Sequence, residues 1–385
     1  MSEHPYRDVA IVGVFNTIQA RRLEGHDSQS IAMEAAFGAL ADAGIELQDV
    51  DAVVGSFAAD MVLELELGPC ARVQNTLGIP AVLQGAQMIA AGEADVVLLA
   101  AGGASVYLDR GATAPWTRPS NELVVSHGLF TAAEFALMAR RHMLLYGTTP
   151  EQMAEVAAVI RNNGHINPDA VYFGRGPFTR DDVLNSRMIA DPFHLLDCST
   201  TSEGGCGLVL ARADRADRSR AAWIYGGASD AFGPSYQVPP VWDMTGRSDL
   251  VAGYVGRQAA TKVFALAGLG PDDVDVAELY DPFSFEIIRQ LEAFGFCGEG
   301  EGGAFVDDGH IALGGRLPVT TDGGTMSFSH AGQNAQMLQR VIRAVEQIRG
   351  ECKSAQVPDA TVAICSNGGA GALFTDVMLL GSERP

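Results

Sequence analysis

An internal repeat constrains the fold of this chain more than any other feature of its sequence. The segment ALADAGIELQDVDAVVGSF (39–57) resembles ALAGLGPDDVDVAELYDPF (265–283). Asp51 in the first segment matches Asp275 in the second. A second pair follows in the same order, since EADVVLLAAGG resembles PDATVAICSNGG later in each half. Two matches in one order predict a duplicated domain.

Short apolar runs alternate with longer segments of helical periodicity around these repeats. Residues 8–14 and 51–57 are typical of buried strands, and residues 30–44 are typical of a helix that ends at Gly44. Residues 81–105 indicate a helix, a turn and a strand that is apolar on both faces, as in the middle of a covered sheet. The alternation predicts an α/β layered architecture.

The 385 residues are enough for two such halves, which we assign to residues 1–215 and 216–385. Residues of about 106–200 do not repeat, and they include a predicted helix within 126–147. We expect this stretch to be a loop domain that is inserted in the N-terminal half and covers the loop face of that half.

Charge and cysteine spacing exclude several classes of function. A formal net charge of −21 argues against nucleic acid as a partner and against an anionic membrane surface. No apolar run is long enough for a transmembrane helix, and the first residues lack the pattern of a signal peptide. The six cysteines form no Cys-x-x-Cys pair, so we expect no metal site and a cytoplasmic location.

Five further segments occur in this order: SHGLFTAAEFALMARRHM, NSRMIADPFHLLDC, EGGCGLVLA, LEAFGFCGEGEGGAFVDDG and GGRLPVTTDGG. Together they resemble the thiolase superfamily, and within it the sterol-carrier or lipid-transfer-protein branch. The resemblance covers nearly the whole chain. It implies a thiolase-like five-layered αβαβα fold built from two duplicated halves with an inserted loop domain. It also implies acyl-CoA substrates, so that coenzyme A enters as part of the substrate and no cofactor is bound permanently.

The nucleophilic cysteine of thiolases is missing from this sequence. The family carries it at the start of the helix that precedes the EADVVLLAAGG strand, where this chain reads CARVQNTLGIPAVLQGAQMIAAG. Either a strand and its cysteine loop are absent, or Asn75 occupies the position. Cys70 is the only cysteine nearby, and it lies several residues too early.

Three other catalytic motifs of the family are partly kept. GGTMSFSHAG resembles the glycine-histidine motif and aligns His330 with the family histidine, while Ser329 replaces a glycine or cysteine. ICSNGGAG resembles the late cysteine-glycine motif, so Cys365 matches the acid/base cysteine. Tyr280-Asp281-Pro282-Phe283 stands where thiolases have Asn-Glu-x-Phe or His-Asp-Cys-Phe. Without the nucleophile, this Tyr-Asp-x-Phe motif resembles the steroid side-chain aldolases.

Retro-aldol cleavage needs a base for a β-hydroxyl and donors for the enolate, but no nucleophile. The resemblance implies that Tyr280 carries the proton, that His330 donates to the thioester oxygen, and that Cys365 protonates the enolate. Adjacent side chains of a strand face opposite ways, so we expect Asp281 to be structural. A structural role also stays open for each of the three catalytic candidates.

We expect substrate contacts from a further set of residues: His127, Ser329, Asn367, Gly368 and Gly369. Three hypotheses follow. The first is an aldolase that cleaves a β-hydroxyacyl-CoA with a bulky, for example steroid, acyl group. The second is a thiolase-type acyl-CoA acyltransferase, an acetyl-CoA acetyltransferase for example, that uses Cys70 or Cys365. The third is a non-catalytic subunit of a heteromer. The resemblance implies either a homodimer or a heteromer with a small protein that carries an oligonucleotide-fold domain and a zinc ribbon.

Overall fold

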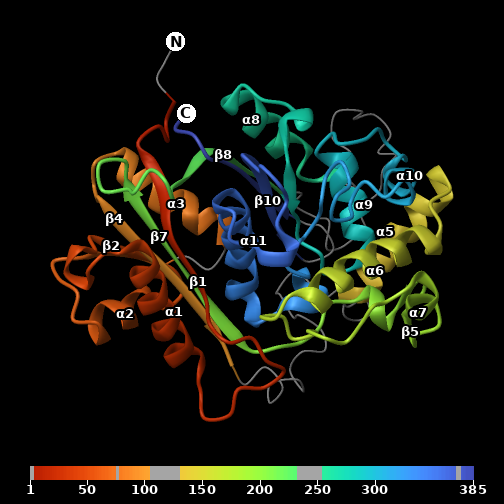
Figure 1. The fold of residues 1–385 in the computed structure, drawn as a ribbon, viewed down its shortest axis with the longest axis horizontal. Helices are drawn as coiled ribbons and strands as arrows, with labels where there is room; N and C mark the ends of the chain where they lie inside the picture. The colour runs from red at the N-terminus through yellow and green to blue at the C-terminus, as the bar shows by residue number, and fades with distance from the viewer. Residues whose placement is uncertain (1–3, 75–77, 105–130, 232–253, 370–373) are drawn as a thin grey trace.

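The computed structural model describes residues 4–74, 78–104, 131–231, 254–369 and 374–385 (Figure 1). The strands are β1 (Val9–Asn16), β2 (Ala52–Val54), β3 (Ala71–Val73), β4 (Val96–Gly103), β5 (Met188–Ala190), β6 (Phe193–His194), β7 (Gly204–Arg212), β8 (Ala222–Ala231), β9 (Val276–Glu278), β10 (Val362–Gly369) and β11 (Phe374–Gly381). The helices are α1 (Ser28–Ala43), α2 (Ala58–Glu64), α3 (Gly78–Ala90), α5 (Thr131–Tyr146), α6 (Pro150–Ile166), α7 (Arg180–Leu184), α8 (Arg257–Ala267), α9 (Ser284–Ala293), α10 (Gly302–Asp307) and α11 (Gly332–Arg349).

The strand order repeats on either side of one junction. Within the described residues the large sheet has the order β3-β2-β4-β7-β1-β8-β11-β10-β9. β1 and β8 meet through two residue pairs, Ala10 with Trp223 and Ile11 with Ala222. Outward from this junction, the N-terminal half has β1, β7, β4 and β2, and the C-terminal half has β8, β11, β10 and β9. In each half the first two pairings are antiparallel and the third is parallel. The predicted duplication is therefore visible in the topology.

The repeated aspartate has the same structural role in both halves. Oδ2 of Asp51 accepts hydrogen bonds from two successive backbone N–H groups at the start of β4, at 2.9 and 3.0 Å. Oδ2 of Asp275 accepts the equivalent pair at the start of β10, at 2.8 and 2.9 Å. Each carboxylate thus aligns its own strand, β2 or β9, with the parallel strand beside it.

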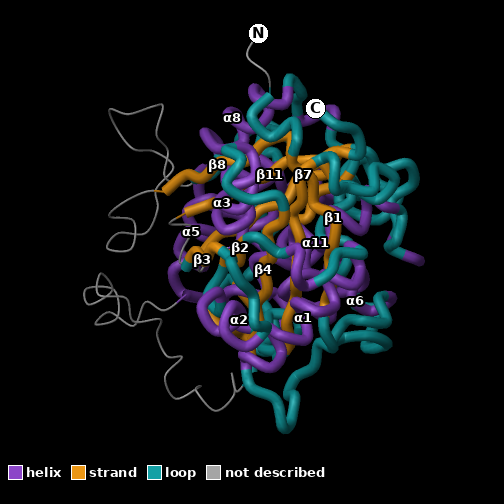
Figure 2. Tube along the Cα trace, turned by 90° about the vertical axis from the view of Figure 1, so that its left-hand side faces the viewer, coloured by secondary structure: helices purple, strands orange, loops and turns teal. Residues whose placement is uncertain are grey.

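Five layers follow from the way the helices cover the sheet. α3 and α11 pack between the two halves and contact strands of both, while α1 covers the outer face of the N-terminal strands and α8 that of the C-terminal strands. A Cβ atom added to Gly78 would lie 2.5 Å from Cβ of Met337, so glycine lets α3 and α11 approach closely. In Figure 2 the strands run through the middle of the molecule with helices on both sides. This is the predicted αβαβα arrangement.

The inserted stretch packs differently from the expectation. Its described helices α5 and α6 bury their apolar faces against α9, and α6 also contacts α10, both in the C-terminal half. Phe135 and Ile160 share one core cluster with Leu291. Helical periodicity predicted the helix that is α5, but it could not identify the surface that covers this helix. The division at residue 215 and the bounds of the loop domain remain predictions.

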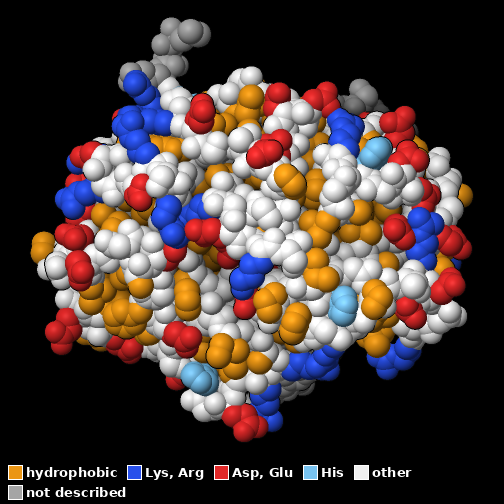
Figure 3. Space-filling model, viewed as in Figure 1, with side chains coloured by type: hydrophobic (Ala, Val, Ile, Leu, Met, Phe, Trp, Pro, Cys, Tyr) orange, Lys and Arg blue, Asp and Glu red, His pale blue; other side chains and the backbone are white. Residues whose placement is uncertain are grey.

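The two ends of the described chain lie together at one edge of the molecule (Figure 1). Nε of Arg384 donates to the carbonyl of Arg7 at 2.9 Å, and its guanidinium forms an ion pair with Asp8. Figure 3 shows acidic and basic side chains interspersed over one face. Among the described helices, none combines the length and the apolar character needed to cross a membrane.

Candidate active site

Tyr280 lies where the chain leaves β9. Its backbone N–H donates to Oγ of Ser366 in β10 at 3.0 Å, and its carbonyl accepts from Nε2 of Gln290 in α9 at 2.7 Å. A Cβ atom added to Gly368 would lie 3.3 Å from Cδ1 of the tyrosine ring, so the ring packs against this glycine. Tyr280 therefore sits at the carboxyl ends of the parallel strands β9 and β10.

Asp281 is buried and holds the turn that leads to the histidine motif. Its carboxylate accepts the backbone N–H of Thr325 at 2.7 Å and of Met326 at 3.1 Å. A Cβ atom added to Gly324, where φ is +57°, would lie 2.1 Å from Oδ2 of Asp281, so only glycine fits there. Burial raises the pKa of Asp281 to about 7, although Arg340 and the two N–H donors oppose the shift. These contacts fit the expected structural role.

His330 follows this turn and lies two residues before the start of α11 at Gly332. Its backbone N–H donates to Oγ of Ser202 at 2.8 Å, and its ring donates to the backbone carbonyl of Thr200. The side chain is partly exposed, yet surrounding protein desolvates the ring and lowers its pKa to about 4. At neutral pH the ring is uncharged. Its one N–H faces Thr200, and its other nitrogen is a hydrogen-bond acceptor.

The segment 198–203 lies between the tyrosine and histidine motifs. The N–H of Ser199 donates to the carbonyl of Pro282 at 2.9 Å, and the N–H of Thr200 donates to the carbonyl of Thr325 at 2.9 Å. Ser202 then bridges to Ala331. One short segment thus holds both motifs side by side. This segment was not predicted from the sequence, although the polar run STTSE directly before β7 is a signal for such a segment.

A chain of buried hydroxyl groups extends from His330. Oγ of Ser202 lies 3.1 Å from Oγ of Ser329, and Ser329 donates to Oε1 of Gln19 at 2.6 Å. Nε2 of Gln19 donates to the carbonyl of Gly205 at 3.0 Å. Ser329 is fully buried and its two partners belong to the protein. A contact between Ser329 and substrate stays a prediction.

Cys365 and Asn367 face the central layer between the two halves. Cys365 is fully buried in the core between the halves. Asn367 is also buried, and it accepts the N–H of Ile79 at the start of α3 at 2.7 Å and donates to the carbonyl of Met337 at 2.7 Å. Strand alternation places Ser366 on the opposite face of β10, where its Oγ accepts the backbone N–H of Tyr280. The catalytic role of Cys365 stays a prediction.

Cys70 lies directly before the edge strand β3 and packs against the outer core, together with Met61 of α2. That core is separate from the central layer to which α11 belongs. Burial raises the pKa of all six thiols of the chain. Gly368 and Gly369 end β10. His127 and Asn75 lie outside the described residues.

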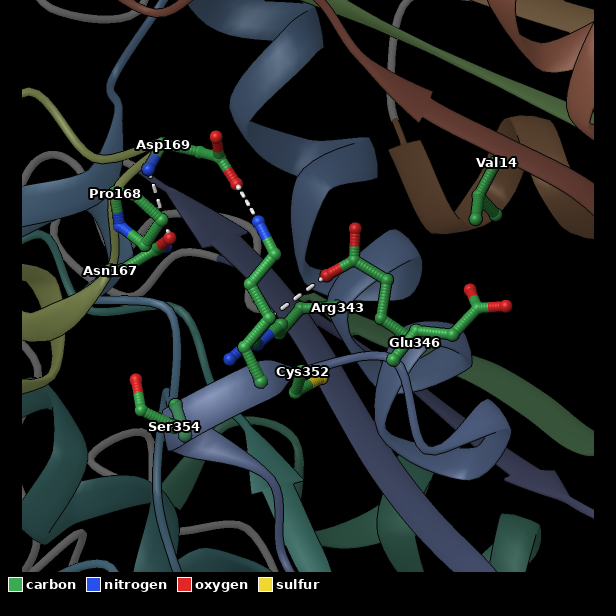
Figure 4. Close-up of a pocket in the computed structure, with 11 residues that line it drawn as sticks. Val14, Asn167, Pro168, Asp169, Arg343, Glu346, Cys352 and Ser354 are labelled. Atoms are coloured by element: carbon green, nitrogen blue, oxygen red, sulfur yellow. Dashed lines mark hydrogen bonds and ion pairs between the residues drawn. The ribbon is translucent and has the colours of Figure 1, made fainter.

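A polar cavity of about 220 Å³ lies at the far end of α11 (Figure 4). Nη1 of Arg343 donates to Glu346 at 3.0 Å, and Lys353 pairs with Asp169 at 3.5 Å across the cavity wall. An α-helix rises about 1.5 Å per residue, so the cavity is roughly 20 Å from His330 along α11. The cavity is thus separate from the tyrosine and histidine motifs.

The layers and the position of the site define a thiolase-fold protein, and comparisons with known proteins agree. Residues 241–382 match the family described as "Thiolase C-terminal domain-like". The structure described as the "Ltp2-ChsH2(DUF35) aldolase" aligns with a TM-score of 0.84 and 31% identity, over 98% of each chain. The steroid side-chain-cleaving aldolase of Thermomonospora curvata is 33% identical, over 97% of this chain and 98% of its own.

A third relative has a different reaction in its name. The acetyl-CoA acetyltransferase of Methanothermobacter thermautotrophicus is also 33% identical, over 95% of this chain and 97% of its own. The chain belongs to the thiolase superfamily, in the sterol-carrier branch that includes steroid side-chain-cleaving aldolases. Identity alone does not separate the two reactions, so the residues of the site must do so.

Proposed function

We propose that this protein is an acyl-CoA aldolase, which cleaves a β-hydroxyacyl-CoA by a retro-aldol reaction. The burial of the cysteine thiols and their raised pKa values are the main support for this proposal. A thiolase reaction needs a cysteine thiolate. Here burial raises the pKa of every thiol. Cys70 packs against the outer core, and Cys365 is fully buried with its thiol against the carbonyl of Met378. A retro-aldol reaction does not need a thiol.

The reaction proceeds without an external oxidant or reductant. The proton of the β-hydroxyl passes to the protein, the hydroxyl carbon becomes a carbonyl, and the Cα–Cβ bond breaks. Its electron pair moves onto Cα and is delocalised into the thioester as an enolate. Return of a proton to Cα gives the shortened acyl-CoA. We propose that Tyr280 carries the proton of the β-hydroxyl. Tyr280 lies at the strand ends, where the two motifs meet.

We propose a different role for His330 from the one that the family resemblance implies. Donation to an enolate oxygen would need a second ring N–H, and a pKa of about 4 leaves that nitrogen unprotonated at neutral pH. We therefore propose that His330 accepts a hydrogen bond from the substrate or from a proton carrier. The backbone N–H groups of Gly368 and Gly369, which end β10, are then the proposed donors to the enolate oxygen.

The relatives support a substrate class and a partner for this proposal. One relative is named 17-hydroxy-3-oxo-4-pregnene-20-carboxyl-CoA lyase, and the solved aldolase contains a DUF35 protein. We propose that this chain takes a bulky steroid-type acyl group. We further propose that it works as a dimer or as a heteromer with a small protein of oligonucleotide-fold and zinc-ribbon type.

Replacement of Tyr280 by Phe tests the aldolase proposal. The CoA ester named for the lyase is incubated with the chain, with and without a co-purified DUF35 partner, and released product is measured. We expect at least a 100-fold loss of kcat because the proton carrier is removed. Binding of the CoA ester and Tm should stay unchanged. Tyr6→Phe, at a buried tyrosine near the N-terminus, is the matched control.

Undiminished turnover by Tyr280→Phe would contradict the proposal. If that turnover also depends on residues of the partner, the chain is a non-catalytic subunit. The acetyltransferase relative keeps a second function open, and iodoacetamide labelling with mass spectrometry distinguishes it. One fast-reacting cysteine that acyl-CoA protects would favour the acyltransferase.

A further inference from the structure

We propose that Ser366 and Gln290 are positioning residues, which aim the phenol of Tyr280 through a closed ring of hydrogen bonds. The inference rests on the proposed function of Tyr280 and extends it to two residues that the sequence motifs do not contain. The three members come from β10, α9 and the end of β9, so the ring depends on the folded core and not on one local turn.

Each bond of the ring has a defined direction. The N–H of Tyr280 donates to Oγ of Ser366 at 3.0 Å, and Ser366 donates to Oε1 of Gln290 at 2.5 Å. Nε2 of Gln290 donates to the carbonyl of Tyr280 at 2.7 Å and to the carbonyl of Glu286 at 3.0 Å. The reversed amide of Gln290 would place N–H₂ against the donating hydroxyl and oxygen against two carbonyls, so only one orientation satisfies every group.

Burial makes the ring act as a unit. Ser366 and Gln290 have no exposed surface, and Tyr280 is 7% exposed. Water therefore has little access with which to replace a lost member. Removal of the Ser366 hydroxyl would leave both the N–H of Tyr280 and the amide oxygen of Gln290 without a partner in a low-dielectric site.

The ring of hydrogen bonds begins directly beyond the end of β9, where strand pairing stops. β9 ends at Glu278, and the N–H and carbonyl of Tyr280 bond to side chains instead of a neighbouring strand. The phenol ring packs on Gly368, where any Cβ atom would lie 3.2 Å from the carbonyl oxygen of Phe374. The hydrogen bonds thus hold the backbone of Tyr280, and Gly368 packs against its phenol ring. A proton carrier held in this way is aimed before substrate arrives.

Kinetics and amide exchange together separate positioning from simple support of the fold. Ser366→Ala removes the serine hydroxyl from the ring of hydrogen bonds, and Ser366→Thr retains a hydroxyl at this position. We expect Ser366→Ala to lower kcat about 10-fold or more with KM changed less than about 2-fold, and Ser366→Thr to recover most of the loss. Thr148→Val is the matched control, because Thr148 is a buried hydroxyl that bonds to His142 at 2.9 Å away from this ring.

Hydrogen exchange of the peptide that contains Tyr280, measured on the free protein, tests the ring of hydrogen bonds independently of turnover. We expect exchange at the Tyr280 amide to be at least about 10-fold faster in Ser366→Ala than in the wild type. If the Tyr280 amide exchanges at the same rate in Ser366→Ala as in the wild type, the proposed ring of hydrogen bonds is wrong. If the exchange is faster but kcat is unchanged, the proposed positioning role is wrong. If Ser366→Ala does not fold, Gln290→Glu is measured in the same way, because it removes the N–H₂ group that donates to the carbonyls of Tyr280 and Glu286 and keeps the acceptor for Ser366. A wild type without aldolase activity would refute the proposed function and leave the exchange result to decide on the ring.

Discussion

His330 shows how the surroundings of one residue set the chemistry available at a site. An ordinary histidine has a pKa near 6.5, and surrounding protein lowers the pKa of His330 to about 4. Between these two values the unfolded chain binds a proton that the folded protein does not bind. The stability linked to His330 is therefore complete above pH 6.5 and is lost as the pH falls toward 4.

The variant His330→Asn should flatten this dependence. Urea unfolding at pH 7.5 and pH 5 gives two free energies of unfolding, and we expect their difference to be about 1–2 kcal/mol smaller in the variant than in the wild type. The exposed His26 supplies the control His26→Asn, which should leave the difference unchanged. Equal pH dependence in wild type and His330→Asn would show that the ring is not desolvated in the folded state.

The motif residues of the candidate site could be predicted from the sequence, whereas their partners could not. Tyr280 and His330 stand in short runs with a recognisable order of residue types. Ser366 and Gln290 reach Tyr280 from other elements, because β10 pairs with β9 and the Gln290 side chain of α9 bonds to the Tyr280 carbonyl. Such contacts follow from packing, and a single sequence carries no direct signal of them.

The repeated aspartates belong to the scale of the element, because each aligns two parallel strands. We expect Asp51→Ala and Asp275→Ala each to lower the free energy of unfolding by about 1–2 kcal/mol, since each leaves two backbone N–H groups without their acceptor. The double variant should lose the sum, because the two sites lie in different halves and share no partner.

Denaturant unfolding of the three variants measures these losses. The exposed Glu93 lies in the turn before β4, and Glu93→Ala controls for the removal of a surface carboxylate. Wild-type stability in either single variant would show that the carboxylate does not support its strand. A double variant that loses much more than the sum would indicate that the halves are coupled through these strands.

Periodicity predicted the elements better than it predicted their contacts. The helix expected over 30–44 is α1, Ser28–Ala43, followed by Gly44 at φ +63°. The strand expected over 51–57 is only Ala52–Val54, because the chain turns at Gly55, where φ is +145°. An apolar face indicates that a helix is buried, but it does not identify the surface against which the helix packs. For this reason the packing of α5 and α6 against α9 differed from the expectation.

At the scale of the whole molecule, the central layer makes the two halves dependent on each other. α3 and α11 each contact strands of both halves, and Asn367 of β10 binds the start of α3. The repeat predicted two similar units, and this prediction is confirmed in their strand order. That the units share a core could be inferred only from the family resemblance, because a repeat in sequence does not say how its copies pack.

The meeting of the chain ends at Arg384 and Arg7 means that the order of the halves along the chain is not required by the fold. A circular permutant that starts at residue 216 and ends at residue 215, with a short linker across the old ends, should keep the same layers. We expect its Tm within about 5 °C of the parent and its specific activity within about 3-fold. A permutant that fails to fold would show that the native order of synthesis, N-terminal half first, is needed to assemble the shared central layer.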